Sequence, residues 1–158
     1  RCRGKGQVAV LLTGKTILIV EDNVQNRVVY HITLRVQGAD LDFDRSGDEA
    51  IARLKRMEHC DLIILDLMLK DGVSGFDVFQ RIREMPRYAH IPIVAVSASD
   101  SAVALPRARA LGFSGYISKP IDEALFPKQI AQIIAGEQVW FDGVMLYPRP
   151  KREGSAPV

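Results

Sequence analysis

The sequence has only two cysteines and no long apolar run, and these absences exclude several classes of protein. Cys2 and Cys60 lie far apart, without the close spacing of metal ligands, which predicts two reduced thiols and a cytoplasmic protein. No apolar stretch approaches the roughly 18 residues needed to span a bilayer, so we expect no membrane segment. The apolar run from Val8 to Leu12 is short for the core of a secretion signal.

The sequence also lacks an excess of charge of either sign. Its 21 basic and 19 acidic residues give a net charge of +2, which indicates no direct binding to nucleic acid or to an anionic membrane surface. The length of 158 residues and the apolar content of 47% are ordinary for one compact core with some tail to spare. We therefore expect one domain.

What the sequence does contain is a regular alternation of short apolar runs and amphipathic stretches. Ile17–Val20 and Leu62–Leu65 are continuous apolar runs, which is typical of buried parallel strands. Further strands are predicted at 41–43, 91–96 and 116–118. Helices are predicted at 23–36, from a cap at Ser46 to Met57, at 76–85, from near Pro106 to before Gly112, and at 121–135.

Five strand–helix units in succession predict an α/β fold. We expect a flavodoxin-like, doubly wound sheet of five parallel strands in the order 2-1-3-4-5, with five flanking helices. The domain is predicted to span 15–135, after an N-terminal arm at 1–14. Residues 136–158 include three prolines and no clear periodicity, so they are interpreted as a C-terminal tail or linker.

Acidic residues end two of the predicted strands. Glu21 and Asp22 follow the first run, and Asp66 follows the third strand. In open α/β sheets the carboxyl ends of the strands form the ligand-binding edge, so the three carboxylates are expected to meet there. Clustered carboxylates repel one another unless a hard cation lies among them, which predicts a site for Mg²⁺ or Mn²⁺.

Two more polar residues end strands at the same edge. Ser97 follows the fourth strand and Lys119 the fifth. A carboxylate beside a divalent cation and an ammonium group is well placed to attack a phosphoryl group, so Asp66 is the predicted nucleophile. Glu21, Asp22 and Asp66 are expected to hold the metal together with the backbone carbonyl of Met68. Ser97 would donate a hydrogen bond to a phosphoryl oxygen, and Lys119 would pair with another.

Four motifs together resemble the receiver domain of two-component response regulators, over roughly residues 15–135. They are ILIVEDN, LIILDLML, VAVSAS and GYISKP, in that order and in matching strand contexts. The stretch EDNVQNR further resembles single-domain regulators and receivers attached to hybrid kinases. The resemblance implies that a sensor histidine kinase or a histidine phosphotransfer protein donates a phosphoryl group to Asp66, with Mg²⁺.

The resemblance also implies a switch rather than an enzyme that acts on external substrates. Phosphorylation would draw Ser97 toward the phosphoryl group and turn Tyr116 inward, which would remodel the face formed by the fourth helix, fifth strand and fifth helix. A downstream protein target would bind that face, and a homodimer through the same face is a further expectation.

Two places depart from the family pattern. The loop after Asp66 carries Lys70 where the family usually has proline, and Gly75 arrives one position late, which indicates an insertion of one residue. Pro106 interrupts the fourth helix, in the usual output face.

Two alternatives to a phosphorylated receiver are consistent with parts of the sequence. A degenerate receiver that acts as a binding module, independent of phosphorylation, stays open because of the altered loop. An aspartate-nucleophile phosphatase is disfavoured, because Met68 occupies the position where such enzymes carry a second acid. We expect a stand-alone regulator, while a receiver from a larger protein stays open.

Overall fold

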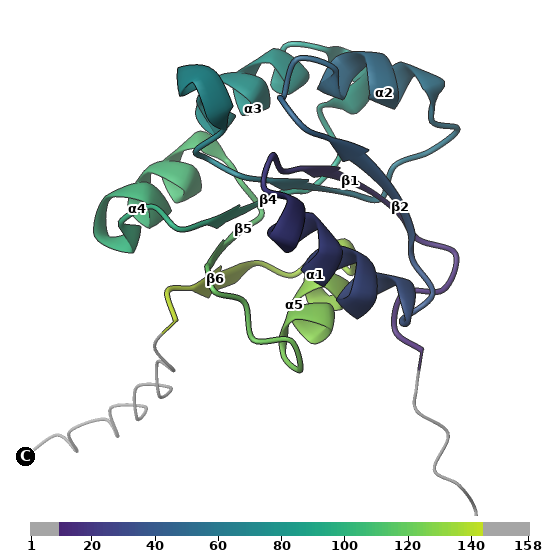
Figure 1. The fold of residues 1–158 in the computed structure, drawn as a ribbon. Helices are drawn as coiled ribbons and strands as arrows, with labels where there is room; N and C mark the ends of the chain where they lie inside the picture. Colours follow the sequence, from purple (N-terminus) through teal and green to yellow (C-terminus); the bar gives the residue numbers. More distant parts are fainter. Residues whose placement is uncertain (1–9, 144–158) are drawn as a thin grey trace, which may run out of the picture.

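The computed structural model describes residues 10–143, which form one twisted sheet covered by helices on both faces (Figure 1). The strands are β1 (Thr16–Val20), β2 (Asp40–Asp44), β3 (Leu62–Leu65), β4 (Ile93–Ser97), β5 (Gly115–Ser118) and β6 (Val139–Phe141). The α-helices are α1 (Val24–Arg35), α2 (Ala50–Arg56), α3 (Gly75–Arg83), α4 (Ser101–Leu111) and α5 (Phe126–Ile134). Two single turns of 3₁₀-helix lie at Lys70–Gly72 and Pro86–Tyr88.

The sheet is parallel throughout and has the order β2-β1-β3-β4-β5-β6. The predicted flavodoxin-like order of the first five strands is confirmed. The prediction of five strands was one short, because β6 lies in the segment 136–158 that was interpreted as tail. Only three residues form β6, too few for a periodic pattern, and it is defined by pairing with β5 rather than by its own sequence.

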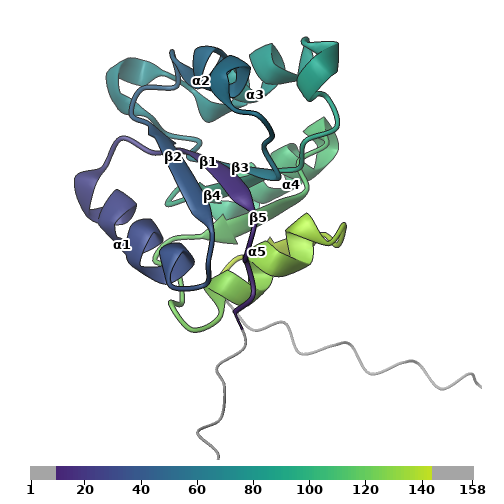
Figure 2. The same ribbon diagram turned by 90° about the vertical axis from the view of Figure 1, so that its right-hand side faces the viewer.

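Helices lie on both faces of the sheet (Figure 2). Two apolar layers hold them against it. On one face, α2, α3 and α4 pack against side chains from the central strands, where Phe79 and Phe113 stack with ring centroids 4.1 Å apart. On the other face, Tyr30 of α1 and Phe126 of α5 stack at 5.6 Å. Because both faces are covered, the central strands are apolar at successive positions, as their sequences predicted.

The fourth helix is longer than the sequence predicted. It begins at Ser101 because Asp100 caps it, with Oδ1 accepting from the backbone N–H of Ala102 at 3.0 Å. Pro106 lies inside this helix and cannot donate to the carbonyl of Ala102. Both residues are exposed, so water can hydrogen-bond to that carbonyl and the helix continues through the proline.

The second helix is shorter than the sequence predicted, and Ser46 does not cap it. Its N-cap is Glu49, which makes no side-chain capping bond. Ser46 instead belongs to the preceding turn, where its N–H donates to Oδ1 of Asp44 and its hydroxyl accepts from the N–H of Asp48.

Among residues 10–143, no helix is both long enough and apolar enough to cross a bilayer.

Candidate functional site

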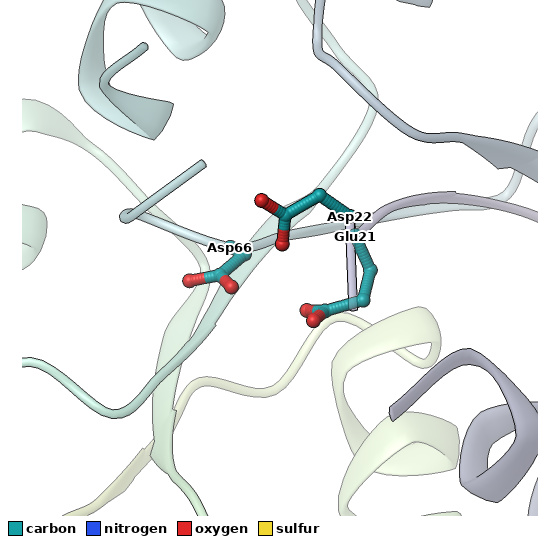
Figure 3. Close-up of side chains that lie close together, drawn as sticks. All are labelled: Glu21, Asp22 and Asp66. Atoms are coloured by element: carbon teal, nitrogen blue, oxygen red, sulfur yellow. The ribbon is translucent and has the colours of Figure 1, made fainter. Parts of the chain in front are cut away.

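The register of the sheet brings the three predicted acids together. Val20 and Leu65 are paired at the ends of β1 and β3, and the N–H of Asp66 donates to the carbonyl of Val20 at 3.0 Å. Glu21, Asp22 and Asp66 follow directly, and each has a carboxylate oxygen within 4.8 Å of the others (Figure 3). Glu21 is 1% exposed and Asp66 is 6% exposed, whereas Asp22 is half-buried.

Lys119 supplies the positive charge of this site from the end of β5. Its Nζ donates to Oε2 of Glu21 at 2.8 Å and to Oδ2 of Asp66 at 2.9 Å. Burial by itself would lower the pKa of Lys119, but the hydrogen bonds and charges of the two carboxylates outweigh it and raise that pKa. The ammonium group therefore stays charged at neutral pH and offsets part of the repulsion between the acids.

Glu21 is held by the first turn of α1. Burial raises its pKa, although Lys119 and the side-chain amide of Asn26, which donates to Oε1 at 2.9 Å, both oppose the increase. Arg27 braces the same segment, because Nη1 donates to the backbone carbonyls of Glu21 at 3.1 Å and Asp22 at 2.8 Å. The sequence reasoning missed Asn26 and Arg27. Their position could have indicated this role, because both residues lie in the first turn of the helix that Asn23 caps, directly after the two acids.

Ser97 and Tyr116 lie in the core beside this edge, joined through Ser99. The hydroxyls of Ser97 and Ser99 are 2.8 Å apart, and Ser97 is fully buried at the end of β4. Tyr116 points inward and is also fully buried, and its hydroxyl donates to the backbone carbonyl of Ser99 at 3.1 Å. Burial raises the pKa of Tyr116, so its hydroxyl stays a donor. The hydroxyl of Ser97 thus bonds to Ser99 rather than to Asp66 in this structure.

The loop after Asp66 also contacts the site, through the backbone of Met68. The N–H of Met68 donates to Oδ1 of Asp66 at 3.0 Å, while the Met68 side chain is 65% exposed. The extra residue predicted here lies in a segment that forms a 3₁₀ turn, in which Asp71 adopts a positive φ of 59°. The backbone carbonyl of Met68 as a metal ligand stays a prediction. Lys70 is exposed.

Gly75 allows this loop to return to Asp66. A Cβ at residue 75 would collide with the backbone carbonyl oxygen of Asp66 and would lie 2.7 Å from Cα of Leu67. The N–H of Gly75 donates to the carbonyl of Leu67 at 3.0 Å, and Ser74 caps α3 through the N–H of Phe76. The glycine that the sequence singled out as displaced by one position therefore sits where no side chain fits.

The donor set fits a hard divalent cation. Three carboxylates supply oxygen ligands of the kind that Mg²⁺ and Mn²⁺ prefer. Within residues 10–143, one ammonium group, that of Lys119, pairs with the two buried acids. An acidic pocket compatible with a divalent metal, as expected from the sequence, is thus present.

Comparison with known proteins agrees with this site. The family model of the response regulator receiver domain matches residues 17–131. The polar-differentiation response regulator DivK of Brucella ovis is 36% identical over 116 residues, which cover 73% of this chain and 93% of that protein. Histidine kinase 2 of Arabidopsis thaliana is 29% identical over 150 residues, which cover 82% of this chain and 13% of the kinase.

Solved structures give the same fold. A sensor protein from Polaromonas sp. JS666 superimposes with a TM-score of 0.70 at 28% identity, covering 77% of this chain and 97% of that chain. The chemotaxis protein CheY4 of Vibrio cholerae, at 24% identity, has a TM-score of 0.69 over 75% of this chain and 98% of its own.

The chain belongs to the response regulator receiver domain family. It is a receiver domain of two-component signalling, a class of protein that works as a switch rather than as a classical enzyme. Receiver domains interact with histidine kinases or phosphotransfer proteins, and the matches to a response regulator and to a histidine kinase fit that class.

Proposed function

We propose that this receiver takes a phosphoryl group onto Asp66 from a phosphohistidine of a sensor histidine kinase or a histidine phosphotransfer protein. One observation carries the proposal: the carboxylate of Asp66 lies among Glu21, Asp22 and Lys119 at the carboxyl edge of the sheet. We place the exchange in the cytoplasm, as the sequence predicted.

The transfer is a displacement at phosphorus. A carboxylate oxygen of Asp66 forms a P–O bond while the P–N bond of the phosphohistidine breaks, and the imidazole nitrogen keeps the electron pair and takes up a proton. Lys119, released from one of its carboxylate partners, neutralises a phosphoryl oxygen. Oδ1 of Asp66 is already oriented by the N–H of Met68 at 3.0 Å.

Glu21, Asp22 and Asp66 would hold the Mg²⁺ or Mn²⁺, with the backbone carbonyl of Met68 as a further ligand. The cation would supply Lewis-acid neutralisation of the negative charge on the phosphoryl oxygens. The order β2-β1-β3 supports this assignment, because Val20 and Leu65 pair at the strand ends and deliver the three acids side by side.

After transfer, the Ser97 hydroxyl would leave Ser99 for the phosphoryl group, and Tyr116 would be held inward. The face of α4, β5 and α5 would then bind a downstream protein target or a second copy of the chain. Tyr116 already bonds to Ser99, and Ser99 to Ser97, which supports a connection between the site and that face.

Labelling tests the proposed function. Incubation with acetyl phosphate and Mg²⁺ should add one phosphoryl group by intact-mass measurement, and Asp66→Asn should abolish the addition. Asp71→Asn is the matched control, because it makes the same chemical change on an exposed residue of the same loop, at a positive φ that asparagine tolerates. Wild-type protein that is never labelled would favour the degenerate receiver, the binding module that the altered loop left open.

The lifetime of the phosphoryl group is a second measurable property. Met68 lies two residues after Asp66, and its side chain is apolar and 65% exposed, so it offers no polar group to orient an attacking water. We expect a comparatively long-lived aspartyl phosphate, with Met68→Asn shortening it. Loss of the wild-type phosphoryl group within seconds at neutral pH would contradict this expectation.

A further inference from the structure

A sixth strand covers the edge of β5. β6 pairs with β5 in parallel register, with Gly115 opposite Val139, Tyr116 opposite Trp140 and Ile117 opposite Phe141. Figure 1 places β6 beside β5, between the side of the sheet that carries α4 and the side that carries α5. The chain therefore covers, with its own residues 139–141, the edge of the strand that carries Tyr116.

The close approach of β6 depends on a glycine. A Cβ at residue 115 would collide with the backbone carbonyl oxygen of Val139 and would lie 3.3 Å from Cδ1 of Ile133. Gly115 has no positive φ, so its role is to leave room for the neighbouring backbone rather than to allow a left-handed turn. The sequence of β5 is thus fitted to a strand at its outer edge.

Both faces of β6 are anchored in the apolar layers. Trp140 packs against the layer that contains Tyr116, and the guanidinium of Arg109, from α4, lies 4.6 Å from the centroid of its ring. Phe141 packs against the opposite layer, which includes Ile130 of α5. β6 therefore contacts all three elements of the face that is expected to change on phosphorylation.

A set of contacts leads from this strand to Ser97, at the end of β4 beside the site. The Ser97 hydroxyl is bonded to that of Ser99, the Ser99 carbonyl accepts from the Tyr116 hydroxyl, and Tyr116 is the register partner of Trp140. A Tyr116 ring that turned out of the core would have to pass the outer edge of β5, where β6 pairs. Trp140 stands at that edge, so docked β6 favours the inward position of Tyr116.

We propose that β6 is a latch whose docking on β5 and the phosphorylation of Asp66 favour each other through Tyr116. The inference rests on the proposed function of Asp66. Coupling between two binding events is reciprocal. If a phosphoryl group at Asp66 raises the equilibrium constant for β6 docking by some factor, docked β6 raises the affinity of Asp66 for a phosphoryl analogue by the same factor. The same docking covers the β5 edge, so a partner or second copy that uses this edge has to displace β6.

Hydrogen exchange of the full chain tests the latch. The amides of β6, residues 139–141, exchange through local opening of the strand, and we expect phosphorylation to slow them by about tenfold, within the roughly 5–150-fold range of typical coupling. β2, at the other edge of the sheet, is the internal control and should keep its exchange rate. Intact mass of the same samples gives the phosphorylated fraction.

Variants test the reciprocal effect. Gly115→Ala should displace β6 and weaken the binding of beryllofluoride, a phosphoryl analogue, by the factor seen in the exchange of the wild type. Trp140→Ala should also weaken the binding of beryllofluoride, whereas Trp140→Phe, which keeps an aromatic ring, should bind it nearly as tightly as the wild type. Tyr116→Phe keeps the ring but lacks the hydroxyl that bonds to Ser99, so phosphorylation of this variant should no longer slow the exchange of β6.

Three outcomes would overturn the proposal. Phosphorylated protein with unchanged exchange of β6 would overturn the latch and leave the proposed function of Asp66 intact. Equal slowing in β2 and β6 would indicate general stabilisation rather than coupling. Protein that never gains mass would remove the proposed function, and the latch with it.

Discussion

Lys119 Nζ lies 2.9 Å from Oδ2 of Asp66, although the two residues are 53 positions apart in the sequence. The same ammonium group donates to Glu21 at 2.8 Å. One ammonium group thus pairs with two carboxylates that are almost fully buried, which makes Lys119 important for the stability of the site and, on the proposed function, for its chemistry.

Replacing Lys119 with methionine keeps the length of the side chain and removes its charge. We expect Lys119→Met to lower the rate of labelling by acetyl phosphate by about 10²-fold or more, the usual effect of losing one preorganised charge or donor at a reaction centre. Lys128→Met, on the exposed surface of α5, is the control and should label normally. A Lys119→Met variant that labels at the wild-type rate would contradict the role given to its ammonium group.

Divalent metal should stabilise the protein by relieving repulsion among the acids. At a Mg²⁺ concentration of 100 times the dissociation constant, mass action adds about 2.7 kcal/mol to the free energy of unfolding, and EDTA should remove that increment. Asp22→Asn should raise stability without metal and reduce the response to Mg²⁺, because Asp22 adds negative charge to the group. Urea unfolding with and without Mg²⁺ measures both effects, and a response equal to that of the wild type would exclude Asp22 from the metal site.

Gly75→Ala should distort the backbone at Asp66. The added Cβ would collide with the backbone of Asp66, so we expect a loss of about 1–3 kcal/mol in stability together with slower labelling. Gly72→Asn is the control, because a Cβ at residue 72 meets no atom within 4 Å and asparagine tolerates its positive φ of 71°. Normal labelling of Gly75→Ala would mean that the loop adjusts without moving Asp66.

Pro106 should cost stability where it stands in α4. Pro106→Ala allows an N–H to reach the carbonyl of Ala102, so we expect the free energy of unfolding to rise, by at most about 3 kcal/mol. Pro127 lies in the first turn of α5, where proline removes no helical hydrogen bond, and it is buried. Pro127→Ala should therefore bring no gain, and thermal unfolding of both variants compares the two positions.

Cys60 should be a poor nucleophile. Burial raises the pKa of its thiol from 9.0 to about 11, so the thiolate fraction near pH 8 is about 100-fold lower than for an ordinary cysteine. In a Cys2→Ser background, alkylation by iodoacetamide should be slow at pH 8 and should accelerate as the pH rises toward 11. Fast alkylation at pH 8 would show that the thiol is more accessible than its position beside β3 indicates.

The sequence predicted best what depends on continuous burial and on strand ends. Leu62–Leu65 is apolar at every position because both faces of β3 are covered, and the residue that follows such a run must lie at the edge of the sheet, which located Asp66. Asn26 escaped prediction because its amide is polar on an ordinary helix, and only the fold brings it to Glu21. The start of α4 was predicted too late because the helix continues through Pro106, which is exposed to solvent. β6 was missed because it is defined by pairing with β5 rather than by its own sequence.

The distance in sequence between the members of the site has a consequence for protein synthesis. Glu21 and Lys119 lie 98 positions apart and come from the first and fifth strands. A chain that has left the ribosome only as far as α4 already holds Glu21, Asp22 and Asp66, but it lacks the cation that joins them. On the proposed function such a chain would not yet accept a phosphoryl group, so a signal would be received only by molecules whose sheet has been completed.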